Sequence, residues 1–108
     1  MINKLAKEIH QIAKSKGFYD KDLIDGIPLE TNIAKWISLM HSELSEGLEA
    51  VRHKIPEGEK GCLSEEFADC IIRILDTSYY LNLDIESAIY KKINKNKNRD
   101  YLHGGKTF

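Results

Sequence analysis

Apolar residues recur along this chain mainly at intervals of three and four, the spacing that places side chains on one face of an α-helix. The first such segment runs from Ile2 to about Lys16, and Gly17 is the expected stop. Glu8 and His10 lie off its apolar stripe, so both side chains are expected to be solvated. The pattern predicts an amphipathic N-terminal helix.

Residues 17–30 break this periodicity, and Gly26 and Pro28 punctuate the segment, which predicts a loop. Loops of this length in a small domain usually have a function. The aromatic residues Phe18 and Tyr19 either pack the loop against the helices or line a pocket for a nucleobase. Packing is favoured because buried aromatic residues usually belong to the core.

A second helix is expected to begin at a cap formed by Thr31 or Asn32 and to end near Lys54, because Pro56 cannot continue it. Trp36 lies at the margin of its apolar stripe, either as an aromatic residue at the edge of the core or as a stacking surface for a nucleobase. The predicted inward stripe consists of six residues: Ile33, Ile37, Met40, Leu44, Leu48 and Val51.

A third helix follows the short polar link of residues 55–61, and a link of this length predicts antiparallel neighbours. Ser64 is the expected N-cap. Within the apolar run of residues 67–75 the only polar side chains are Asp69 and Arg73. A buried charge must be paired or bound to a metal, so either these two residues form an ion pair or Asp69 is a metal ligand. The two alternatives are compatible.

Asp84 is expected to cap a fourth helix whose inward residues are Ile85, Ala88, Ile89 and Ile93. Four helices and no credible strand predict an all-α fold, bundle-like, in a single domain of residues 1–108. Residues 91–108 form a basic, partly extended tail of that domain.

Composition narrows the possible functions. The net charge of −1 argues against a general nucleic-acid binder. Cys62 and Cys70 lack zinc-site spacing and are expected to be reduced thiols, Cys70 in the core. The sequence shows neither a signal peptide nor a membrane span, so a cytoplasmic protein is expected.

Two acidic pairs stand out. Glu43 and Glu46 lie on the second predicted helix, and Glu66 and Asp69 on the third; in each pair the i, i+3 spacing puts both carboxylates on one face. An isolated pair of this kind is usually solvated, but two pairs on adjacent core-type helices would gather four carboxylates. Such a group is repulsive unless cations lie within it, above all Mg²⁺, with Mn²⁺ as an alternative. The sequence therefore predicts a metal site acting on phosphates.

The residues SELSEGLEAVR (42–52), EEFADCIIRILD (65–76) and the tail motif N-K-x-R before H-G-G-K resemble the MazG-like nucleotide pyrophosphohydrolases of the all-α NTP pyrophosphohydrolase superfamily. The signature of that family is E-x-x-E followed about 20 residues later by E-x-x-D, each pair on its own helix. The resemblance covers residues 32–106. It implies Mg²⁺-dependent cleavage of a (deoxy)nucleoside triphosphate into monophosphate and pyrophosphate, by a homodimer or a dimer of dimers.

The resemblance also implies residue roles. The four acids would be the metal ligands, and Glu43 or Glu46 would activate the attacking water. The candidates for phosphate contacts are Lys92, Asn96 and Arg99, followed by His103 and Lys106. Two other hypotheses for the function stay open. One is a pyrophosphohydrolase specific for another nucleotide, of the dUTP or phosphoribosyl-ATP type, and the other is a non-catalytic helical interaction module.

Overall fold

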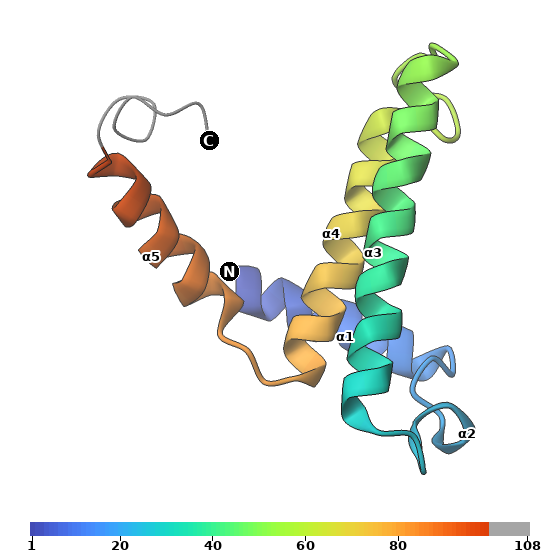
Figure 1. Cartoon of the computed structure of the whole chain (residues 1–108), viewed down its shortest axis with the longest axis vertical. Helices are drawn as coiled ribbons and strands as arrows, with labels where there is room; N and C mark the ends of the chain where they lie inside the picture. The colour runs from blue at the N-terminus through green and yellow to red at the C-terminus, as the bar shows by residue number, and fades with distance from the viewer. Residues whose placement is uncertain (100–108) are drawn as a thin grey trace.

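The computed structural model of the chain describes residues 1–99, all of whose regular elements are helices, which confirms the all-α prediction (Figure 1). Their bounds are α1 (Ile2–Ser15), α2 (Lys21–Ile24), α3 (Leu29–Arg52), α4 (Leu63–Tyr80) and α5 (Ile85–Lys97). The single turn α2 lies within the segment that was predicted to be a loop. No helix in this part of the chain combines the length and the apolar character needed to cross a membrane.

Helices α3 and α4 form an antiparallel hairpin, as the short link predicted, and α1 packs across the end of α4 (Figure 1). Helix α5 points away from this hairpin, and its main contacts are with α1. The described residues of one chain therefore do not close into a four-helix bundle.

Two predicted helix caps are wrong. Pro28 is the N-cap of α3, so Thr31 lies within the helix and the side chain of Asn32 is buried there. Proline suits a helix start because its missing N–H would have no partner there. Cys62 is the N-cap of α4, and Ser64 lies in the first turn, where its hydroxyl donates a hydrogen bond to Glu57.

The cap of α5 is confirmed. Asp84 Oδ1 accepts a hydrogen bond from the backbone N–H of Ser87 at 3.1 Å. This bond satisfies one of the free N–H groups at the start of the helix.

Most of the stripe predicted to face inward on α3 faces outward in this chain, and only Ile33 and Met40 are partly covered. Four of its members, Ile37, Leu44, Leu48 and Val51, are 44 to 57% exposed. The buried residues of α3 are instead Asn32, Glu43, Gly47 and Ala50. Periodicity shows which residues share a face, but it does not show which face the same chain covers.

Small side chains explain why α4 covers the other face of α3. A Cβ atom added at Gly47 would lie 3.3 Å from Leu63 Cδ1 and 3.7 Å from Glu66 Cβ. The absence of that atom lets the two helices approach closely. The close approach places the acid-bearing sides of α3 and α4 against each other.

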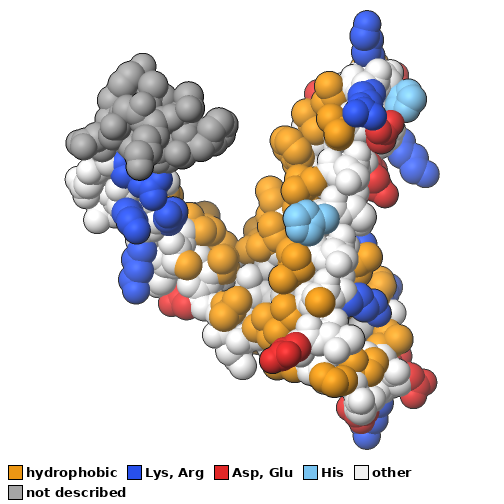
Figure 2. Space-filling view, viewed as in Figure 1, with side chains coloured by type: hydrophobic (Ala, Val, Ile, Leu, Met, Phe, Trp, Pro, Cys, Tyr) orange, Lys and Arg blue, Asp and Glu red, His pale blue; other side chains and the backbone are white. Residues whose placement is uncertain are grey.

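The interior of the described chain is small. Its buried apolar residues are Ala6, Ala50, Cys62, Cys70 and Leu75, so the prediction for Cys70 is confirmed. The apolar run of residues 67–75 on α4 is not buried throughout, since Phe67, Ile71 and Ile72 are about half exposed. No residue of α5 is fully buried: Ile85 and Ile89 of its predicted inward stripe are partly covered, and Ala88 and Ile93 are exposed. Hydrophobic side chains therefore line much of the visible surface (Figure 2).

Candidate metal centre

Three of the predicted ligands meet across the α3–α4 interface. Glu43 and Glu46 lie one turn apart on α3, and Glu66 faces them from α4. One carboxylate oxygen from each lies within 4.8 Å of the others. Glu43 and Glu66 are each only 8% exposed, whereas Glu46 is open to solvent. We refer to these three residues as the acidic cluster.

Glu66 is the least satisfied member of the acidic cluster. Its Oε2 is buried and, within the described chain, has no hydrogen-bond partner. The hydrogen bond that protonated Glu66 can donate to Glu46, burial, and the negative charges of Glu46, Asp69 and Glu43 raise the pKa of Glu66 to about 7. An unpaired buried oxygen surrounded by like charges is costly. A cation between the carboxylates would remove that cost.

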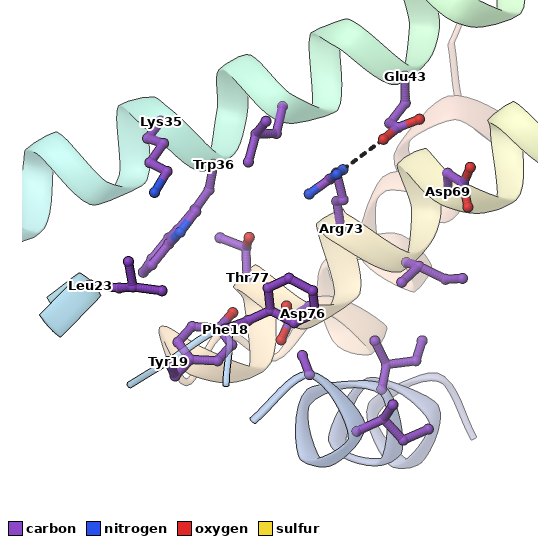
Figure 3. A pocket seen from close by; sticks show the side chains of 15 residues that line it. Phe18, Tyr19, Leu23, Lys35, Trp36, Glu43, Asp69, Arg73, Asp76 and Thr77 are labelled. Atoms are coloured by element: carbon purple, nitrogen blue, oxygen red, sulfur yellow. Dashed lines mark hydrogen bonds and ion pairs between the residues drawn. The ribbon is translucent and has the colours of Figure 1, made fainter. Parts of the chain in front are cut away.

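Arg73 supplies the positive charge nearest to Glu43. Its Nε donates a hydrogen bond to Glu43 Oε1 at 2.9 Å, across the interface between α4 and α3 (Figure 3). Of the two alternatives for Asp69, the ion pair with Arg73 is therefore not formed, because Arg73 pairs with Glu43 instead. The buried carboxylate of Glu43 needs a counter-charge more than the partly exposed Asp69 does.

Asp69, the fourth predicted ligand, does not belong to the acidic cluster. It lies three residues after Glu66 on α4 and lines a neighbouring cavity. Its charge still contributes to the raised pKa of Glu66. The structure thus brings three predicted ligands together and places the fourth beside them.

A cavity of about 530 Å³ opens next to the acidic cluster, between α1, α3, α4 and the segment that follows α1 (Figure 3). Its volume is within the range of small-molecule sites. Glu43 and Asp69 border it at one end, and Trp36 forms part of the wall farther along α3. Its lining is mostly apolar, with two cations, Lys35 and Arg73. The full lining is Ile9, Ile12, Ala13, Phe18, Tyr19, Leu23, Lys35, Trp36, Leu39, Glu43, Asp69, Ile72, Arg73, Asp76 and Thr77.

Aromatic rings pack together at the end of the cavity away from the acidic cluster. The rings of Tyr19 and Tyr80 stack at 4.9 Å between centroids, and Trp36 meets Tyr80 edge-on at 5.0 Å. Tyr19 thus packs its segment onto the helices, which was the favoured alternative, and its ring also lines the cavity. Phe18 lines the cavity as well, but it remains largely exposed.

His10 is a buried residue that the sequence reasoning missed. Its Nδ1 lies 2.8 Å from Asp76 Oδ1, and its ring lies 4.6 Å from that of Tyr19. Burial and a hydrogen bond to Asp76 raise the pKa of Tyr19. The available signal was the i, i+4 spacing of His10 and Ala6, which share the face of α1 that packs on α4. The expectation that Glu8 is exposed is confirmed.

The predicted phosphate-binding residues lie apart from the cavity in this chain. Lys92 and Asn96 are on α5, and Arg99 follows that helix. None of the three lines the cavity. His103 and Lys106 lie outside the described residues. Comparisons with protein-family models, with curated proteins and with solved structures found no match to this chain.

Proposed function

We propose that this chain is a Mg²⁺-dependent pyrophosphohydrolase that cleaves (deoxy)nucleoside triphosphates into monophosphate and pyrophosphate, as the MazG-like proteins that its sequence resembles do. One observation carries the proposal. Among residues 1–99, Glu66 Oε2 is buried without a hydrogen-bond partner, and it belongs to a cluster in which one carboxylate oxygen from each of three residues lies within 4.8 Å of the others. Native proteins rarely keep such a group unless it has a ligand or a catalytic role.

The residues fit a hard divalent cation. Three carboxylates offer only oxygen donors, which Mg²⁺ and Mn²⁺ prefer over soft ligands. No thiol or imidazole belongs to the acidic cluster. Once bound, the ion would polarise a phosphoryl group and lower the pKa of water. Glu43, Glu46 and Glu66 would hold it, with Asp69 adjacent.

The roles of the surrounding residues follow from their positions. Glu46 is the better candidate to accept the proton of the attacking water, because Glu43 is already engaged by Arg73. Arg73 and Lys35 would offset phosphate charge inside the cavity, and Trp36 would contact the base. Lys92, Asn96 and Arg99 stay predicted phosphate ligands.

We also propose that the protein works as a homo-oligomer. The described helices leave apolar side chains half exposed on α3, α4 and α5. An apolar surface of this extent is unusual on a monomer and marks interaction sites.

The test is product analysis by chromatography with each NTP and dNTP, with and without Mg²⁺. We expect monophosphate and pyrophosphate only when Mg²⁺ is present. Glu46→Gln should lower the rate at least about 100-fold, the usual contribution of a general base. Glu49→Gln is the matched control, because Glu49 is exposed on the same helix and paired with Arg52. Activity toward a single non-standard nucleotide would replace the general assignment, and no activity toward any nucleotide would overturn it.

A further inference from the structure

Asp76 lies in the wall of the cavity, and the proposed function gives it no role. Its Oδ1 lies 2.8 Å from His10 Nδ1, and a hydrogen bond also joins Asp76 to Tyr19. His10 reaches Asp76 from α1 and does not line the cavity, whereas Asp76 does. The side chain of Asp76 is 19% exposed. The carboxylate is therefore held by two neighbours and still opens toward the cavity.

Asp76 lies between the two ends of the cavity. Helix α4 contributes Asp69, Arg73 and Asp76 to the wall at helical spacing, and Figure 3 shows them in this order toward Tyr19. The seven residues from Asp69 to Asp76 correspond to about 10 Å along the helix axis. This length is comparable to that from the first phosphate of a nucleotide to the outer edge of its base. A nucleotide with its phosphates beside Asp69 and Arg73 would thus bring its base to Asp76.

A carboxylate in this position can only accept hydrogen bonds. Its two oxygens offer about four acceptor positions, of which His10 and Tyr19 use two. Because a carboxylate has no proton to give, His10 Nδ1 is the donor in the 2.8 Å contact. The cavity around Asp76 is mostly apolar, so the edge of a ligand that faces the remaining acceptor positions has to donate. A ligand oxygen in that place would leave two acceptors unpaired, which is costly.

We propose that Asp76 makes the site select nucleotides whose base carries an amino group, by accepting a hydrogen bond from the 4-amino group of cytosine or the 6-amino group of adenine. The inference rests on the proposed function and names its substrate class. Uracil, thymine and hypoxanthine have a carbonyl oxygen at that position, so they place an acceptor against an acceptor. Trp36 and Tyr19 line the same cavity, but stacking on aromatic rings tolerates every base. Asp76 therefore carries the selection.

Two matched substrate pairs test the proposal: dCTP with dUTP, and dATP with dITP. The members of each pair differ in the amino group, which a carbonyl oxygen replaces. For each pair that wild type hydrolyses, we expect kcat/KM to be at least about 10-fold higher for the amino member, the usual contribution of a hydrogen bond to a charged group. Asp76→Asn supplies an amide that can donate as well as accept, so it should bring the ratio close to one or invert it.

Asp25→Asn is the matched control, because it makes the same chemical change at an exposed residue that does not line the cavity. It should keep the wild-type ratio. Asp76→Ser, which also supplies a donor, is the second variant if Asp76→Asn does not fold. Equal kcat/KM values within both pairs in wild type would overturn the proposal, and so would a preference that survives unchanged in a folded variant of Asp76.

Binding gives a readout that does not depend on catalysis. Trp36 is the only tryptophan of the chain and lines the cavity, so its fluorescence reports occupation. We expect dCMP to bind at least about 10-fold more tightly than dUMP, or dAMP than dIMP, and Asp76→Asn to remove the difference. If wild type hydrolyses no nucleotide but shows this preference, the proposed function fails and the base selection stands. If wild type hydrolyses nucleotides without preference within either pair, the selection fails and the proposed function stands.

Discussion

Replacement of Arg73 by glutamine should destabilise the metal-free protein toward unfolding and raise its affinity for Mg²⁺. In the metal-free protein the guanidinium provides the only hydrogen-bonded counter-charge that the described structure gives Glu43. A divalent ion has to compete with that guanidinium for the same carboxylate. Removal of Arg73 leaves Glu43 buried without a counter-charge and, at the same time, available to the ion.

The magnitude follows from the geometry of the pair. Unit charges about 4 Å apart attract by about 1 kcal/mol in water and by about 4 kcal/mol at an effective dielectric constant of 20. The side chain of Glu43 is 10% exposed, but that of Arg73 is 41% exposed, so screening moves the value toward the lower limit. We therefore expect Arg73→Gln to lower the free energy of unfolding of the metal-free protein by about 1 to 2 kcal/mol. We expect it to strengthen Mg²⁺ binding by the same amount, which is a change in affinity of about 5- to 30-fold.

The assay is Mg²⁺ titration by calorimetry, together with urea unfolding in EDTA. Arg52→Gln is the control, because Arg52 pairs with Glu49 on α3 at 3.3 Å and both side chains are more than half exposed. The exposed pair should contribute at most about 1 kcal/mol and should leave Mg²⁺ affinity unchanged. If Arg73→Gln binds Mg²⁺ more weakly than wild type, the competition argument is wrong.

Three further changes test other parts of the account. In EDTA, wild type should lose stability as the pH rises from 4.5, the ordinary pKa of glutamate, to about 7, because in that window the unfolded state ionises Glu66 and the folded state does not. Glu66→Gln should remove this loss. Melting across pH measures it, and the same profile in both proteins would contradict the prediction. Gly47→Val should separate α3 from α4, because even a Cβ at this position would lie 3.3 Å from Leu63 Cδ1. The variant should therefore bind Mg²⁺ more weakly in the calorimetric titration. Unchanged affinity would show that Mg²⁺ binding does not need the close approach of the two helices. Glu86→Gln should destabilise the protein at neutral pH but not at acid pH. Hydrogen bonds from the N-terminal amine and from the backbone lower the pKa of Glu86, so its contribution to stability is present above the pKa of the unfolded state and is lost as the pH falls through the lower pKa of the folded state. Melting of both proteins across pH measures this, and a larger destabilisation at acid pH would contradict it.

The sequence predicted the helices well because their signals are local. Apolar spacing and glycine or proline stops located α1, α3, α4 and α5. Asp84 was also identified as a cap, because its side chain bonds a neighbour only three residues away. The starts of α3 and α4 were misplaced, since Pro28 and Cys62 begin these helices without a side-chain hydrogen bond.

Burial was harder to predict, because it depends on which face another element covers. Leu44 and Leu48 have the spacing of a core stripe, yet α4 packs on the side of α3 that carries Gly47. His10 lies off the apolar stripe, yet it is buried against Asp76, a residue 66 positions away. The contact with Asp76 leaves no periodic signal in the sequence, and the i, i+4 spacing of Ala6 and His10 is only a local sign of a buried face.

The candidate site, too, could be predicted where it depends on local spacing, and could not be predicted where it depends on contacts between helices. The i, i+3 spacing placed Glu43 and Glu46 on one face, and the short link brought Glu66 toward them. From the sequence, the only partner that could be suggested for Arg73 was Asp69, which lies four residues away on the same helix. The partner in the structure, Glu43, lies on another helix. The position of Lys92 depends on the direction of α5, which the bonds between Glu86 and the chain start determine.

The most direct test is a crystal structure of the protein grown with Mn²⁺, in which anomalous scattering locates the ion. The account predicts a peak enclosed by the carboxylates of Glu43, Glu46 and Glu66, which is absent from crystals of Glu66→Gln. A protein that crystallises with Mn²⁺ but shows no peak between these carboxylates would contradict the claim that they form a cation site.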